Sequence, residues 1–505
     1  MSILPQKRPH DMPSYLSWKT HSETLKQTGL RGLFEKDSNR FESFSFSPSQ
    51  GSAKDSFMVD VSRNFISEKT LDIWEKFSEE IELTKAKKCM QGNLAINETE
   101  ERTTPHTLFR TPLYQQPKTW QKALKEVGNF IRKIRSQELL GYDQQTITDI
   151  VHIGIGGSLL GPKLLSEALY SERIDGIRLH FASYLENSPQ LLSQLRPERT
   201  LFLFVSKSME SDEIVLSLKI AKTWFLHSAT EEDWQHHVYI VSSNTELASK
   251  LNSSKGHIFS IPPETNGRFS IWSPVSLSVQ SVLREGAFEE FLAGAHDMDE
   301  HFWTSPFREN IPTLLACLSF QYLHFWHFTH HAIIPYHGSL SSLIPYLQQL
   351  VMESLGKSVD RTGKPTFYPT YPLVFGEIGT QVQHSLSQAL HQGTLVIPSD
   401  LILFGKTTGS ASCTEFLLSN GLAQAQALLN GKTYLGEEHK SCVGNRPSNL
   451  FLLKNLSPYT LGMLIACYEH KTFVESILQN VHAFDQWGVE LGKKMVVKLR
   501  SGMRH

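Results

Sequence analysis

Two loops in the sequence carry the residue types that bind phosphate. In the first, Val151-His-Ile-Gly-Ile-Gly-Gly-Ser-Leu-Leu-Gly-Pro162, an apolar strand runs into glycines, a serine and then a helix. The second, Ser206-Lys-Ser-Met-Glu-Ser211, follows the apolar run Leu201–Val205. Glycines let the backbone approach a ligand, while serine hydroxyls and the free N–H groups of a helix start favour an anion. Each loop alone equally suits an ordinary turn or helix cap, but together they favour a phosphorylated small molecule.

A dinucleotide site is the main alternative for the first loop. The spacing Gly154-x-Gly156-Gly157 does not fit the pattern G-x-G-x-x-G, because Leu159 stands where the last glycine belongs. An acidic residue at the end of a strand about 20 residues further on is also missing. The sequence therefore disfavours a nicotinamide dehydrogenase.

The elements that must position these loops alternate between strands and helices. Apolar runs typical of strands occur at Ile147–Ile155, Ile177–Ala182, Leu201–Val205, Val238–Val241 and Ile258–Ile261, and, after a helical connection at 280–330, at Ala332–Tyr336, Leu373–Phe375, Leu395–Ile397 and Leu401–Phe404. This alternation predicts parallel sheets covered by helices on both faces, with the loops meeting at the carboxyl ends of the strands.

We therefore expect an α/β protein with two αβα sandwich domains in series, mostly parallel sheets, a helical N-terminal extension and C-terminal helices. The expected boundaries are 1–110 for the extension, 111–285 for the first sandwich and 286–505 for the second. Helices are predicted after Ser67, from about 120 to 134, and over 461–479. The serine-rich stretch 38–54 reads as a loop.

Composition excludes several classes of protein. The 505 residues are 40% apolar, and 49 Lys and Arg face 51 Asp and Glu, which gives a net charge of −2. Disorder is excluded, and nothing indicates a nucleic-acid or membrane surface. Residues 311–352 lack charge, but glutamine and histidines interrupt that run, so a buried helix is expected there. Five scattered cysteines and the absence of an apolar N-terminal signal indicate a reducing, cytoplasmic location.

Four histidines form the only candidate metal cluster in the sequence. His324, His327, His330 and His331 could partly share a helix face, but they alternate with aromatic residues and have no carboxylate or cysteine beside them. A packed helix or a subunit contact is the preferred interpretation. We therefore expect no metal and no cofactor.

At this point the sequence resembles the phosphoglucose isomerase (glucose-6-phosphate isomerase) family, in motifs that run in family order from about residue 96 to 494. Besides the two loops, the matching motifs are Asn97-Glu-Thr-Glu-Glu-Arg102…His106…Arg110, Gly267-Arg-Phe-Ser-Ile-Trp-Ser273, Tyr346-Leu-Gln-Gln-Leu-Val-Met-Glu-Ser354, Gly379-Thr…Gln383-His384…His391-Gln-Gly-Thr394, and Leu461-Gly…Tyr468-Glu-His-Lys471…Phe484-Asp-Gln-Trp-Gly-Val-Glu-Leu-Gly-Lys493.

The resemblance implies roles for individual residues. Glu353 matches the carboxylate that moves a proton between C2 and C1 of an open sugar through a cis-enediol(ate). Arg268 matches the cation that stabilises the enediolate, and His384 and Lys493 match the groups that assist ring opening. The matching substrate-binding positions are Gly157, Ser158, Ser206, Lys207, Ser208, Ser211, Gln349 and Gln486. Of these, Ser206, Ser208 and Ser211 would hold the phosphate.

The resemblance also implies sugar-isomerase (SIS-type) sandwiches and a homodimer in which His384 enters the neighbouring subunit's site. The implied reaction is the reversible, cofactor-free conversion of glucose 6-phosphate to fructose 6-phosphate in glycolysis and gluconeogenesis. The rival from another class is a non-catalytic sugar-phosphate sensor. A sensor would need the hydroxyl loops but neither Glu353 nor Lys493, so the presence of both favours the enzyme.

The sequence departs from the family pattern at a few positions. Glu210 stands where threonine is usual, Asn266 where glycine is usual and Leu355 where asparagine is usual. The usual Gly-Thr-Asn-Gly-Gln-His reads Gly379-Thr-Gln-Val-Gln-His384, so Gln381 and Val382 replace an asparagine and a glycine. Since a valine disfavours positive φ, we expect the backbone at Val382 to avoid that region or to carry strain, which affects the placement of His384.

Overall fold

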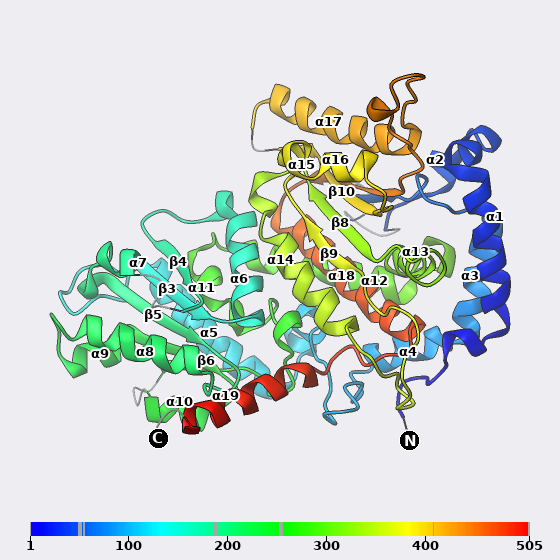
Figure 1. Ribbon diagram of the computed structural model, residues 1–505. Helices are drawn as coiled ribbons and strands as arrows, with labels where there is room; N and C mark the ends of the chain where they lie inside the picture. The colour runs from blue at the N-terminus through cyan, green and yellow to red at the C-terminus, as the bar shows by residue number, and fades with distance from the viewer. Residues whose placement is uncertain are drawn as a thin grey trace.

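The chain folds around two β-sheets, each flanked by helices (Figure 1). The computed structural model describes residues 2–48, 53, 56–184, 189–251, 256–407 and 409–502. A five-stranded sheet is built from the first half of the chain, and a six-stranded sheet combines the second half with two N-terminal strands. The predicted α/β class with two mostly parallel sheets is confirmed.

The first sheet is parallel throughout and has the order β4-β3-β5-β6-β7. Its strands are β3 (Asp149–Gly154), β4 (Arg178–Ala182), β5 (Thr200–Val205), β6 (Val238–Ser242) and β7 (Ile258–Ser260). The helices of this half are α5 (Lys118–Arg135), α6 (Gly157–Ala168), α7 (Pro189–Ser193), α8 (Asp212–Phe225), α9 (Glu231–His237), α10 (Thr245–Leu251) and α11 (Leu277–Val282).

The central strand β5 shows why its sequence is almost continuously apolar. Phe202 and Phe204 pack with residues of α8 and α9 on one face, whereas Leu201 and Leu203 pack with α5 and α11 on the other. Successive side chains of a strand point to opposite faces, so a strand covered on both faces must be apolar at every position.

The second sheet has the order β1-β2-β11-β10-β8-β9. Strands β8 (His330–Pro335), β9 (Leu373–Gly376), β10 (Ser399–Lys406) and β11 (Ser448–Asn455) are parallel, while β1 (Ser45–Phe46) and β2 (Phe57–Asp60) are antiparallel. The helices that follow the first half are α12 (Ala287–Thr304), α13 (Ile311–Trp326), α14 (Leu343–Gln348), α15 (Gly379–Ser385), α16 (Ser387–Gln392), α17 (Ala411–Asn430), α18 (Pro458–Leu478) and α19 (Glu490–Gly502).

The N-terminal extension is helical, as expected, but it also supplies β1 and β2 to the second sheet. Its helices are α1 (Pro13–Lys36), α2 (Arg40–Ser43), α3 (Glu68–Glu80) and α4 (Leu83–Gln91). The predicted helix after Ser67 is α3, which Ser67 and Thr70 begin with a capping box. Within the predicted loop 38–54 the chain forms α2 and β1, while 49–52 and 54 lie outside the described residues.

One predicted strand is wrong, and the strands β1, β2 and β11 were not predicted. Residues 395–397 form no strand, because the Arg446 side chain donates hydrogen bonds to the carbonyls of Leu395 and Gly393, at 2.7 and 2.6 Å. Ile397 is apolar because it packs in the core beneath α16 and α17 rather than because it pairs in a sheet. The strand that pairs with β10 is β11, which follows much later in the chain.

The uncharged stretch 311–352 begins with α13, whose residues are all buried. None of the helices in the described ranges has the length and apolar character needed to cross a membrane. Helix α13 ends at Trp326, His327 adopts a left-handed φ of 55°, and His330 and His331 belong to β8. The four histidines therefore share no helix face. Among the described residues, no group of three or more His, Cys, Asp and Glu is placed to hold a metal ion.

Candidate active site

The two phosphate-loop candidates lie side by side at the carboxyl ends of neighbouring strands. Strands β3 and β5 are paired in parallel, and their last residues, Gly154 and Val205, are directly opposite each other. Helix α6 begins just after β3, and α8 begins a few residues after β5. Two helix N-termini therefore start from this edge of the sheet, where open α/β sheets bind ligands.

The first loop is fixed by close backbone contacts. A Cβ atom on Gly157 would lie 2.0 Å from the carbonyl carbon of Gly267, and Gly156 has a φ of 55°, so both positions require glycine. Beneath the loop, a ring nitrogen of the buried His152 lies 2.7 Å from the Ser158 carbonyl oxygen. Burial lowers the pKa of His152 to about 4, so the ring is neutral near pH 7 and serves as a hydrogen-bonding support.

The second loop, Ser206–Ser211, which we call the serine loop, is held by its own hydroxyls and by β6. The backbone N–H of Met209, at a φ of 58°, donates to the Ser206 hydroxyl at 3.1 Å. The Lys207 carbonyl accepts hydrogen bonds from the residues that end β6. Ser211 caps α8 without a side-chain hydrogen bond to the helix, while Ser208 accepts from the Glu210 N–H. The loop is thus shaped by hydrogen bonds between hydroxyls and its backbone, and its polar groups lie at a helix start.

The catalytic candidates Glu353 and Arg268 form an ion pair. Arg268 Nη1 lies 3.3 Å from Glu353 Oε1, and the guanidinium also donates to Ser354 Oγ, at 2.8 Å, and to the carbonyls of Ala483 and Asp485. Arg268 is 2% exposed, and burial lowers its pKa while the nearby carboxylates oppose that shift. The guanidinium is thus fixed in position against the carboxylate.

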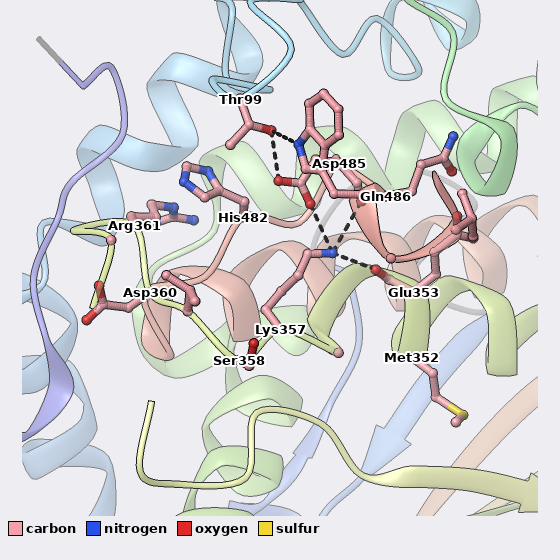
Figure 2. A pocket seen from close by; sticks show the side chains of 16 residues that line it. Thr99, Met352, Glu353, Lys357, Ser358, Asp360, Arg361, His482, Asp485 and Gln486 are labelled. Atoms are coloured by element: carbon pink, nitrogen blue, oxygen red, sulfur yellow. Dashed lines mark hydrogen bonds and ion pairs between the residues drawn. The ribbon is translucent and has the colours of Figure 1, made fainter. Parts of the chain in front are cut away.

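Glu353 reaches a cavity of about 620 Å³ (Figure 2). It ends a π-helical turn, Gln349–Glu353, that continues α14, and π turns often mark functional sites. The predicted residue Gln486 also lines this cavity, together with Lys357 and Asp485. The cavity therefore joins the end of α14 to the chain segment that follows α18.

Lys357 and Asp485 are functional candidates that sequence reasoning missed. Lys357 Nζ donates to the Glu353 carbonyl at 2.8 Å and lies 3.2 Å from Asp485 Oδ1, while Thr99 donates to Asp485 Oδ2 at 2.8 Å (Figure 2). Burial lowers the pKa of Lys357, and its contact with Asp485 opposes that effect. Both residues lie inside or beside matched motifs, so proximity to Glu353 and to Gln486 was the available signal.

Gln349 connects the first loop to the turn that bears Glu353. A Cβ on Gly156 would lie 3.1 Å from Gln349 Nε2, so the Gln349 amide lies over the first loop, which we call the glycine loop. Its Oε1 atom is buried and has no hydrogen-bond partner within the described part of the chain. A buried acceptor without a partner is costly, which suits a position that binds a ligand hydroxyl.

Behind the ion pair lies a network of buried polar side chains. The Tyr346 hydroxyl lies 3.3 Å from both the Arg268 carbonyl and Glu469 Oε1. Glu469 also accepts from Trp272 Nε1 at 2.9 Å and is paired with Arg110. Burial raises the pKa of Tyr346, so its hydroxyl stays protonated and donates. The network links the backbone of Arg268 to α14 and α18.

His384 and Lys493 lie apart from this arrangement. His384 is exposed on α15, and Lys493 is exposed on α19, where it pairs with Glu490 at 2.8 Å. Val382, which replaces the family glycine, lies in α15 without a positive φ and packs in the core. The replacement thus avoids strain, and His384 sits on a regular helix.

Hydroxyl loops beside a carboxylate–guanidinium pair, at the carboxyl edge of a parallel sheet, define an α/β enzyme that acts on a small phosphorylated substrate. The family described as phosphoglucose isomerase matches residues 60–505 of this chain. The glucose-6-phosphate isomerases of Pseudomonas putida (strain W619) and Pseudomonas entomophila (strain L48) are each 37% identical to it, over 97% of this chain and 93% of theirs.

A solved structure of a glucose-6-phosphate isomerase is also similar to this chain. The crystal structure of a glucose-6-phosphate isomerase from Chlamydia trachomatis is similar with a TM-score of 0.88 and 28% identity, over 99% of this chain and 97% of that chain. The chain belongs to the phosphoglucose isomerase family. The resemblance of the motifs and the expectation of an isomerase from this family are confirmed.

Proposed function

We propose that this protein catalyses the reversible conversion of glucose 6-phosphate to fructose 6-phosphate. The observation that carries the proposal is the Glu353–Arg268 pair: Glu353 lines the cavity, and Arg268 follows Gly267, which packs against Gly157 of the first loop. Family membership supports an aldose–ketose isomerisation of this substrate. The ion pair offers a carboxylate and a fixed cation, which are the two groups that the proton transfer requires.

The proton transfer is assigned to Glu353. Its carboxylate takes the proton from C2 of the open aldose, and the electron pair forms the C1–C2 double bond of a cis-enediol(ate) as the C1 carbonyl becomes a hydroxyl or alkoxide. The protonated Glu353 then returns a proton to C1 while the carbonyl re-forms at C2. The fixed Arg268 guanidinium favours negative charge on the enediolate oxygens, because it needs no reorganisation during the reaction.

The phosphate is assigned to the loops after β3 and β5. The hydroxyls of Ser206, Ser208, Ser211 and Ser158 donate to the phosphate oxygens, while Gly157 and Lys207 contribute backbone N–H groups. Gln349 and Gln486 are assigned to the sugar hydroxyls.

Ring opening is assigned to His384 and Lys493, which a homodimer with shared active sites would supply. His384 would come from a second copy of the chain, because it is exposed here. Apolar residues left exposed around the start of α19 and along it support such a contact: Trp487, Leu491, Met495 and Leu499 are 59%, 70%, 49% and 60% exposed. In ring opening the ring oxygen gains a proton as the C1 hydroxyl loses one, and an imidazole can carry out such transfers because it gains and loses a proton near neutral pH.

The remaining assignments follow from the chemistry. An enediol route with this guanidinium needs no metal and no cofactor, so we assign neither. We place the reaction in glycolysis and gluconeogenesis, and the five unpaired cysteines support a cytoplasmic location. The proposed domains are an extension over 1–110 and SIS-type sandwiches over 111–285 and 286–505, which together provide one chain's share of the site.

The test is a coupled assay of the purified protein on fructose 6-phosphate, run with a strong chelator in deuterated water. We expect turnover in the presence of chelator and solvent deuterium at C2 of the aldose. Absence of turnover would overturn the proposed reaction, loss restored by a divalent ion would overturn the metal-free assignment, and turnover without any exchange would indicate a hydride shift.

A further inference from the structure

A second charged cavity lies at the opposite end of the first sheet. It has a volume of about 610 Å³ and is lined by residues that precede or begin the strands β3, β4 and β5, including Thr148 and Arg178. The serine loop and the glycine loop follow the other ends of these strands. A six-residue strand spans about 20 Å, so this cavity is separate from the candidate active site.

Four arginines line this cavity, which we call the arginine pocket: Arg173, Arg178, Arg196 and Arg199. Among its described lining residues, Asp175 is the one carboxylate. Arginine side chains are suited to phosphate because the planar guanidinium presents five N–H donors in a fixed fork. The pocket thus brings four such groups from different segments to one concavity.

Arg178 is anchored from outside the pocket by a buried acid. Its Nη2 atom lies 2.8 Å from Asp149 Oδ2, and Asp149 is fully buried in β3. Burial by itself would raise the pKa of Asp149, but hydrogen bonds from His180, Arg178 and Thr148 lower it to about 2. The carboxylate stays charged near pH 7 and holds Arg178 at the start of β4.

Arg196 and Arg199 are held in the same manner at the approach to β5. Arg196 Nε donates to Glu198 at 2.9 Å, and Arg199 Nε donates to Asp143 at 3.4 Å. Neither carboxylate lines the pocket. Each of these contacts engages one nitrogen of a guanidinium, so the other N–H donors remain available to a ligand.

Arg173 differs because it forms no ion pair within the described part of the chain. Its Nη2 atom donates to the Ser166 carbonyl at 3.1 Å, and the guanidinium lies 5.0 Å from the centre of the Tyr170 ring. Burial lowers the pKa of Arg173. Its positive charge is therefore balanced by no acid at hydrogen-bond distance.

The volume and the remaining lining residues indicate the kind of ligand. Sites for small organic molecules occupy about 300–1,000 Å³, which is far more than one phosphate group fills. Ile174, Ile177 and Leu179 give the pocket an apolar wall next to the arginines. We propose that the arginine pocket binds a small organic compound that carries two or more phosphate groups, with guanidiniums on the phosphates and the apolar wall on the organic part.

The test measures binding to the full chain by calorimetry, with adenosine triphosphate, inorganic tripolyphosphate and inorganic phosphate as probes in a chelating buffer. The pocket variant is Arg196→Gln/Arg199→Gln, which changes the two arginines at the approach to β5 at little cost in stability. The control is Arg132→Gln/Arg308→Gln. It removes the same charge from two exposed, ion-paired arginines elsewhere on the surface.

We expect adenosine triphosphate to bind more tightly than tripolyphosphate, and tripolyphosphate more tightly than phosphate. The pocket variant should weaken the binding of adenosine triphosphate at least ~10-fold, because one hydrogen bond to a charged group changes an affinity by about that factor. The control should stay within about twofold. Saturating fructose 6-phosphate should leave the affinity unchanged.

Three outcomes would overturn the proposal. They are an affinity for phosphate equal to that for adenosine triphosphate, an equal loss in the control variant, and competition by fructose 6-phosphate. The first would mean that the pocket does not select polyphosphates, the second that only net charge matters, and the third that the probe binds at the serine loop. Thermal melts of both variants show whether each is folded.

Discussion

The two halves of the proposed catalytic set lie in contrasting surroundings. Arg268 and Glu353 lie in contact, and Arg268 is 2% exposed and donates hydrogen bonds to two backbone carbonyls. His384 and Lys493 are exposed, and their described contacts hold neither of them near the cavity. One half is thus built into the core of a single chain, whereas the other lies on helix surfaces.

This difference follows from what each half must do. A group that stabilises developing charge acts best when it is fixed before the reaction, and burial in a hydrogen-bonded network fixes it. A group that opens the ring must act on a substrate that has to enter and leave, and an element from a second copy or a moving helix allows that. Variants that remove one half or the other should therefore behave differently.

Glu353→Gln should give the largest effect on turnover. Glutamine keeps the shape and a hydrogen bond to Arg268 but cannot carry the proton, so turnover should fall by roughly 10²–10⁴. Binding of fructose 6-phosphate, measured by calorimetry, should persist. Glu300→Gln, on the exposed face of α12, is the matched control and should leave turnover unchanged. Near-normal turnover in Glu353→Gln would remove Glu353 from the mechanism.

His384→Gln should reduce turnover by about 10², at the low end of the range for a positioned acid or base. Co-expression of this variant with Glu353→Gln, carrying different tags, gives a hybrid dimer. One of its two sites contains both native side chains if His384 crosses the interface, so the hybrid should recover about half of the wild-type turnover. A hybrid as inactive as its parents would show that His384 is not shared between subunits.

Tyr346→Phe tests whether the buried network positions Arg268. Loss of the hydroxyl should lower turnover about tenfold with KM nearly unchanged, because the Arg268 backbone loses a contact while the phosphate loops are untouched. Tyr468→Phe is a matched control: it removes a buried hydroxyl that donates to Asp400 at 2.8 Å, away from the ion pair. Equal loss of turnover in both variants would mean that the effect is general destabilisation.

The contrast between core and surface also explains what the sequence could predict. Eight of the nine predicted strand segments coincide with strands. Each of these segments is a short apolar run, and such runs can be recognised from the local sequence alone. Residues 395–397 were wrongly predicted to form a strand, because the burial there comes from packing under helices. Strands β1 and β2 were missed because they are short. They join the sheet only where β2 pairs with β11, which lies almost 400 residues later.

For the site, spacing alone selected the two anion loops, and the resemblance to a family selected Glu353 and Arg268. No local pattern marks either residue, since their proximity arises from the packing of α14 against the segment that bears Arg268. Lys357 and Asp485 were not predicted for the same reason. In the sequence each resembles an ordinary surface charge, and only the fold brings the two side chains together. The surroundings of His384 cannot be predicted from one chain if a second copy completes them.

Val382→Gly should have the smallest effect on turnover, although it restores the residue usual in the family. Val382 is 4% exposed in α15, and its replacement removes buried apolar surface and adds a flexible residue to a helix. Stability to urea should fall by about 2–4 kcal/mol, while turnover stays within about twofold, because the backbone of α15 already positions His384 without a positive φ. A several-fold rise in turnover would show that valine holds His384 in a poorer position, and would place the exposed half of the site under control of this helix.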